Sequence, residues 1–128
     1  MKKTTADWLA LAKYDLVTVE AMLAARRYVY VLFCCQQAIE KALKAHIAEQ
    51  GDEAPPLIHN LVRLRQLAFP DGGLPCDDDF LRELSAYYIQ SRYLAEMVYL
   101  TDISDEVDIG RVATKTREVT QWLMEHLV

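Results

Sequence analysis

Two sets of polar residues in the sequence could bind a phosphate-bearing ligand. The first is the narrow polar strip formed by Gln37, Lys41 and Lys44 on a predicted helix whose other positions are largely apolar, with Gln36 and Glu40 alongside. A helix that is apolar on two sides must be covered on two sides, so we do not expect this strip to be ordinary solvated surface over its whole length. The simplest role for Glu40 and Lys44 is a helix-stabilising pair four residues apart.

The second set lies elsewhere in the chain and centres on Arg92 and His59. An arginine fork can bind an anionic ligand, and the competing interpretation of Arg92 is an ion pair with Glu96 or a cap at a helix end. His59 follows a proline-containing loop. It is either a residue at the start of a helix or an imidazole that contacts phosphate or transfers a proton near Arg92. Tyr93 could contact a ligand or pack as a half-buried aromatic residue. These alternatives stay open at the level of sequence.

Composition and charge exclude several classes of protein. With 128 residues, 52% hydrophobic and 26% charged, the chain is expected to form one globular domain over residues 1–128. Its net charge of −5 argues against a non-specific electrostatic grip on nucleic acid. Cys34, Cys35 and Cys76 lack the spacing of a zinc site, so we expect buried reduced thiols and neither a metal nor a cofactor.

The sequence also predicts a soluble, cytoplasmic protein. The first residues, MKKTTADW, lack the apolar core of a signal peptide. No apolar run approaches the roughly 20 residues that a membrane-spanning helix needs.

Helical periodicity runs through most of the chain and must position these residues. We expect helices over residues 6–25, with Thr5 as N-cap, and over residues 30–50, ended by Gly51. A short third helix falls within residues 57–69, a fourth begins near residue 80 with its end beyond residue 89 left open, and a last one covers residues 109–127. Residues 101–108 are expected to form an exposed loop. The predicted architecture is all-α, an antiparallel up-and-down four-helix bundle with an additional short helix.

The order of the motifs along the chain resembles the HEPN domain. The resemblance rests on a tryptophan-bearing first helix, FCCQQAIEKALKAHI at residues 33–47, His59-Asn60-Leu61 after the proline-containing loop, and YYIQSRY at residues 87–93. Each fragment is common alone, whereas their order and spacing together are more specific. The resemblance implies an all-α domain that is usually dimeric. It is often encoded beside a small nucleotidyltransferase, with which it forms a toxin–antitoxin pair.

The resemblance also implies a type of chemistry, from which this chain departs. Many HEPN domains are metal-independent ribonucleases in which an Arg is followed after four to six residues by a His. After Arg92 no His falls in this window, and Met97 occupies the expected position. Methionine cannot transfer a proton, so catalysis is expected to be degenerate. In this alignment Tyr99 matches a tyrosine that partner nucleotidyltransferases can modify with AMP. A second alignment, of residues 88–93 with a Y-x-x-x-R-Y motif, also lacks the His.

Two functions are compatible with these observations. The favoured one is a non-catalytic homodimer that binds a nucleotide or another phosphate-bearing ligand, pairs with a small nucleotidyltransferase, or does both, with Gln37, Lys41, Lys44, Arg92 and Tyr93 at the ligand. The alternative is a metal-independent ribonuclease that acts on RNA through Arg92 and a non-standard His59. The surplus of apolar and aromatic residues near residues 87–100 predicts a dimer contact there. Its members are Tyr87, Tyr88, Tyr93, Met97, Val98, Tyr99 and Leu100.

Overall fold

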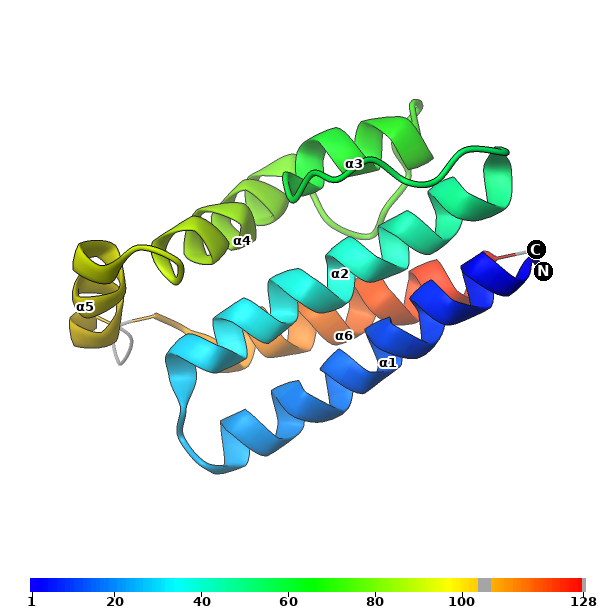
Figure 1. The fold of residues 1–128 in the computed structure, drawn as a ribbon. Coiled ribbons are helices and arrows are strands. Elements are labelled where there is room, and N and C mark those ends of the chain that lie inside the picture. Colours follow the sequence, from blue (N-terminus) through cyan, green and yellow to red (C-terminus); the bar gives the residue numbers. More distant parts are fainter. Residues whose placement is uncertain (104–106, 128) are drawn as a thin grey trace.

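A computed structural model describes residues 1–103 and 107–127, and the regular structure of these residues is entirely helical (Figure 1). The helices are α1 (Lys3–Ala24), α2 (Tyr28–Gln50), α3 (Leu61–Ala68), α4 (Asp78–Gln90), α5 (Leu94–Ile103) and α6 (Ile109–Glu125). Along the chain α1, α2, α4 and α6 alternate in direction, as Figure 1 shows. The prediction of an all-α helical bundle is confirmed. None of the described helices is both long enough and apolar enough to span a membrane.

Helix α2 is the central element of the bundle. It contacts each of the other described helices, and 15 of its 23 residues are buried. His46 is among them: its Nε2 lies 2.7 Å from the backbone oxygen of Leu123, to which it must donate. Burial lowers the pKa of His46 below its ordinary value, so the buried form is the neutral imidazole. His46 is therefore a core residue.

The start of α1 is attached to the end of α2. Helix α1 begins before Thr5, so the prediction of Thr5 as N-cap is wrong. Thr5 is instead buried inside the helix, where its hydroxyl donates to Glu49 Oε1 at 2.9 Å. The Lys2 ammonium group donates to the backbone oxygen of Gly51, which ends α2 as predicted but in an extended conformation, with φ −132° and ψ 177°.

Helix α3 begins later than its apolar spacing predicted. The spacing of Leu57 and Leu61 suggested a helix through residue 57, yet α3 begins at Leu61 and Leu57 is exposed. Asn60 is the N-cap, and its side-chain oxygen accepts from the backbone N–H of Arg63 at 3.0 Å. His59 therefore lies in the connecting loop, which leaves its side chain able to reach α2.

The fourth predicted helix is interrupted. It ends at Gln90, and α5 begins at Leu94, so Arg92 lies in the break between two helices. The Ser91 hydroxyl donates to the backbone oxygen of Tyr88 at 2.7 Å, a local bond that competes with continuation of the helix. The prediction of a loop over residues 101–108 is wrong for residues 101–103, which belong to α5. Residues 104–106 lie outside the described residues.

Candidate functional site

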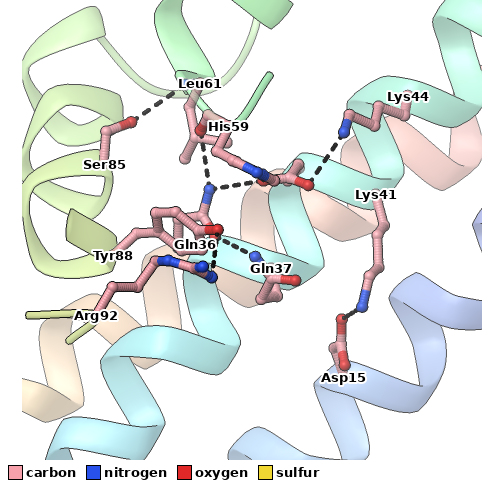
Figure 2. Close-up of polar contacts among 11 residues, drawn as sticks. Asp15, Gln36, Gln37, Lys41, Lys44, His59, Leu61, Ser85, Tyr88 and Arg92 are labelled. Carbon is pink, nitrogen blue, oxygen red and sulfur yellow. Dashed lines mark hydrogen bonds and ion pairs between the residues drawn. The ribbon is translucent and has the colours of Figure 1, made fainter. Parts of the chain in front are cut away.

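A buried carboxylate on α2, Glu40, contacts several of the candidate residues, among them His59, Gln36 and Lys44, which are labelled in Figure 2. Its Oε1 accepts from Gln36 Nε2 at 3.0 Å and from His59 Nδ1 at 2.9 Å, and its Oε2 accepts from Lys44 Nζ at 3.2 Å. Gln37 Nε2 donates to Gln36 Oε1 at 2.7 Å. The Glu40 and Lys44 side chains are only 5% and 4% exposed. Burial of two charges is tolerated here because each faces an opposite charge.

His59 is held against α2 through both its backbone and its ring. Gln36 Nε2 donates to the backbone oxygen of His59 at 2.9 Å, and the ring Nδ1 donates to Glu40. The His59 side chain is nevertheless 51% exposed. Its Nε2 has no hydrogen-bond partner within the described part of the chain. The imidazole is therefore fixed at one nitrogen and available at the other.

Tyr88 on α4 places Arg92 beside His59. The Tyr88 ring is buried, stacks on Phe33 at a centroid distance of 5.8 Å, and lies 4.9 Å from the His59 ring centroid. The Arg92 guanidinium carbon is 5.4 Å from the Tyr88 centroid, and Arg92 Nη1 donates to the Tyr88 hydroxyl at 3.1 Å. Across residues 1–103 and 107–127, Arg92 forms no ion pair, with Glu96 or any other acid. Its charge is available to an anionic ligand.

Both lysines of the predicted ligand strip are engaged inside the bundle. Lys41 Nζ lies 2.5 Å from Asp15 Oδ2 on α1. Lys44, besides pairing with Glu40, lies over the Trp8 ring at 5.4 Å from its centroid. Figure 2 shows the two ammonium groups pointing in different directions, Lys41 toward Asp15 on α1 and Lys44 toward the side of α2 on which His59 lies. The contacts with Asp15 and Trp8 fasten α1 to α2.

The remaining candidates lie on or near α5. Tyr93 and Tyr99 are exposed, and no contact within the described residues joins their side chains to His59 or Arg92. The residues of the predicted dimer contact fall into a buried group and an exposed group. Tyr88 and Leu100 are buried inside the chain, whereas the exposed apolar side chains on or next to α5 are Ile89, Tyr93, Leu94, Val98 and Tyr99. We call this set the α5 surface.

Gln36, Glu40, His59, Tyr88 and Arg92 are joined by the contacts described above, and we call them the cluster. Sequence reasoning missed the roles of Glu40 and Tyr88 in it. Glu40 was interpreted through its neighbour Lys44, and Tyr88 as an interface residue. The usable signal was the spacing of Gln36 and Glu40, which places two polar side chains one turn apart on an otherwise apolar helix. That spacing indicates a buried polar contact but does not say which loop supplies the partner.

The cysteines and potential metal ligands do not add a second chemistry. Burial raises the pKa of the Cys34 thiol, and burial raises that of Cys35 to about 12, so both are protonated, unreactive core residues at neutral pH. Burial likewise raises the pKa of Cys76 to about 11. Among the residues that the structure describes, no group of three or more His, Cys, Asp or Glu side chains could hold a metal ion.

Comparison with known proteins agrees with this fold. The model of the HEPN domain family matches residues 5–127. The crystal structure of TT1696 from Thermus thermophilus is similar, with a TM-score of 0.74, 22% sequence identity, and coverage of 98% of this chain and 100% of that chain; at this identity the likeness concerns the fold alone. No match was found among curated proteins. Because the family model spans nearly the whole chain, this protein belongs to the HEPN domain family.

Proposed function

We propose that this HEPN domain binds a nucleotide or another phosphate-bearing ligand at Arg92 without cleaving it. The observation that carries the proposal is an exposed arginine that has no acidic partner in the described structure and is held on the Tyr88 ring beside a half-exposed histidine. A guanidinium already held in place loses little conformational entropy when it binds phosphate. His59 and Gln37 supply further polar groups, whereas Lys41 and Lys44 act by holding the surrounding helices.

Titration calorimetry with AMP and ATP tests this proposal. Arg92→Ala removes charge-assisted hydrogen bonds to phosphate, so we expect binding to weaken at least about tenfold. Arg82→Ala is a matched control: Arg82 is also exposed and lies on α4, but it pairs with Asp79 at 2.9 Å. Equal affinities of the Arg92→Ala variant and the unaltered protein would exclude Arg92 as the phosphate contact. An unaltered protein that binds neither nucleotide at millimolar concentration would contradict the function itself.

The α5 surface supports the proposal of a homodimer. Its side chains include Leu94, which is 84% exposed, with Tyr93 and Val98 nearby. Exposed apolar surface of this kind is typical of contacts between proteins. We expect light scattering after size-exclusion chromatography to give twice the 14.7 kDa mass of one chain, and Leu94→Glu to lower it to one chain. A single-chain mass for the unaltered protein would contradict the dimer.

A small nucleotidyltransferase in a toxin–antitoxin-like pair is the proposed protein partner. Tyr99 is the proposed acceptor of AMP because it is exposed in the single chain and matches the family tyrosine, so its modification requires that the α5 surface is not covered by a second copy. Mass spectrometry after incubation with such an enzyme and ATP should show one added AMP on this chain. The addition should be absent in Tyr99→Phe, which keeps the ring. Modification at another residue would reject Tyr99 as the acceptor.

The ribonuclease alternative has one observation in its favour. The contact between His59 Nδ1 and Glu40 is the kind of support that a proton-transferring histidine requires. Against it stands Met97, which replaces the family histidine. We expect purified protein to leave RNA intact in the presence of EDTA. Cleavage that disappears in both His59→Ala and Arg92→Ala would establish the alternative in place of the binding function.

A further inference from the structure

The three hydrogen bonds of Glu40 constrain the protonation pattern of His59. Lys44 Nζ and Gln36 Nε2 can only donate, whereas an imidazole nitrogen can donate or accept. Glu40 Oε1 belongs to a carboxylate, which accepts only, so His59 Nδ1 must carry a proton to form the 2.9 Å contact. In the neutral ring the lone pair is then on Nε2, the nitrogen that has no partner in the described structure.

We propose that Glu40 is the positioning residue of this site and fixes the orientation and tautomer of His59, so that Nε2 accepts a hydrogen bond from a hydroxyl or amino group of the nucleotide while Arg92 holds its phosphate. The inference rests on the proposed ligand-binding function and assigns Glu40 a role beyond pairing with Lys44. Glu40 itself does not touch the ligand, because it lies behind His59 and is almost fully buried.

The other contacts of His59 cannot select the tautomer. The Tyr88 ring, at a centroid distance of 4.9 Å and an interplanar angle of 33°, restricts where the imidazole lies but does not distinguish its two nitrogens. Gln36 bonds to the backbone oxygen of His59 and not to its ring. Within the described residues, the choice between Nδ1–H and Nε2–H therefore falls to Glu40.

Lys44 makes this role testable by a conservative substitution. In Glu40→Gln the side chain keeps its shape but has one acceptor and one donor end. Because Lys44 is charged and can only donate, the amide oxygen is expected to face Lys44 and the amide nitrogen to face His59. Gln36 Nε2 then loses its bond to residue 40 and keeps the one to the backbone oxygen of His59. His59 Nδ1 must then accept, and the proton moves to Nε2. The substitution thus reverses the tautomer without removing the ring.

The experiment is ¹⁵N NMR of the histidine side chains in the full chain at pH 8.5, where neutral imidazoles report their tautomer. The sequence has three histidines, and the other two serve as internal references: His46 donates from Nε2 to Leu123, and His126 Nδ1 donates to the backbone oxygen of Trp122 at 2.8 Å. A His59→Gln variant assigns the remaining signal. We expect His59 to match the His126 pattern in the unaltered protein and the His46 pattern in Glu40→Gln.

Asp15→Asn is the matched control, because it removes a carboxylate that pairs with Lys41 of the same helix but has no contact with His59. It should leave the His59 tautomer unchanged. An Nε2–H tautomer in the unaltered protein would overturn the proposal, and this spectrum decides alone if Glu40→Gln does not fold. Retention of Nδ1–H in a folded Glu40→Gln variant would overturn it as well.

Ligand affinity separates this proposal from the function on which it rests. We expect Glu40→Gln to bind AMP roughly five- to tenfold more weakly, the effect of one mismatched hydrogen bond at the ligand. A reversed tautomer with unchanged AMP affinity would reject the positioning role. Absence of AMP binding by the unaltered protein would instead reject the proposed function, while the tautomer measurement would still test the structural role of Glu40.

Discussion

Helix α2 carries two ion pairs only a few residues apart, and they serve different purposes. Glu40 and Lys44 are 5% and 4% exposed and are connected to His59, whereas Asp15 and Lys41 are 15% and 19% exposed and connect α2 to α1. The first pair organises a polar group that remains available to a ligand, and the second fastens two helices. A continuous polar strip in the sequence thus contains one part that supports a site and one part that supports the bundle.

The largest effect is expected from breaking the inner pair. Lys44→Met leaves the Glu40 carboxylate buried without its cation, so we expect a loss of about 3–5 kcal/mol in the free energy of unfolding, measured by urea denaturation. Glu40→Gln combined with Lys44→Met removes both charges and should recover part of this loss. A double variant no more stable than Lys44→Met would show that charge pairing is not what makes Lys44 important.

The outer pair should matter less. Lys41→Met leaves Asp15 partly open to water, so we expect a loss of about 1–2 kcal/mol in the same measurement. The difference between the two lysine variants is the quantity of interest. If Lys41→Met were as destabilising as Lys44→Met, the two pairs would be equivalent and the distinction drawn from burial would fail.

The pH dependence of the free energy of unfolding tests whether His46 is buried as the neutral imidazole. Burial lowers the pKa of His46 in the folded chain below the ordinary value of 6.5, so between these two values the unfolded chain binds more protons than the folded chain. The free energy of unfolding should therefore fall as the pH decreases below about 6.5. His46→Gln removes this group and should flatten that part of the profile. If the free energy of unfolding of His46→Gln changed with pH as steeply as that of the unaltered protein, other groups would be the cause of the pH dependence.

The smallest effect on the free energy of unfolding is expected for substitution of Arg92. Arg92 is exposed, and within the described structure its side chain hydrogen-bonds only to the Tyr88 hydroxyl, so Arg92→Ala should change the free energy of unfolding by no more than about 0.5 kcal/mol. Thermal unfolding followed by circular dichroism checks this. A large loss would mean that Arg92 holds α4 in place. A fall in the ligand affinity of Arg92→Ala could then come from a displaced α4 and not from a lost contact with phosphate.

The sequence was sufficient for the bundle because apolar spacing determines which helix faces are buried. In α6 the residues at helical spacing, including Val112, Thr116 and Leu123, are buried, and α2 is central as its two apolar faces required. Local signals were less reliable where two of them competed. At the start of α3 the capping residue Asn60 outweighed the apolar spacing of Leu57.

The candidate site could be predicted only as a set of residues and not as an arrangement. Arg92 and His59 were identified by type and position, but their meeting depends on Tyr88, which the helix α4 carries toward α2. The contact of His59 with Glu40 joins residues 19 positions apart and is set by how the loop before α3 returns to α2. Apolar periodicity describes one helix at a time, so it contains no information about the path of the loop that brings His59 back to α2.

The separation along the chain of the cluster residues has a consequence for the order of folding. Helices α1 and α2 are joined by residues 25–27 and can pair early, because contacts between neighbouring elements need little loop closure. The cluster, in contrast, requires α2, the loop carrying His59 and the end of α4 to be docked together. We therefore expect the cluster to form after the α1–α2 pair. A folding intermediate that contains only the α1–α2 hairpin would have its helices in place and no competent site.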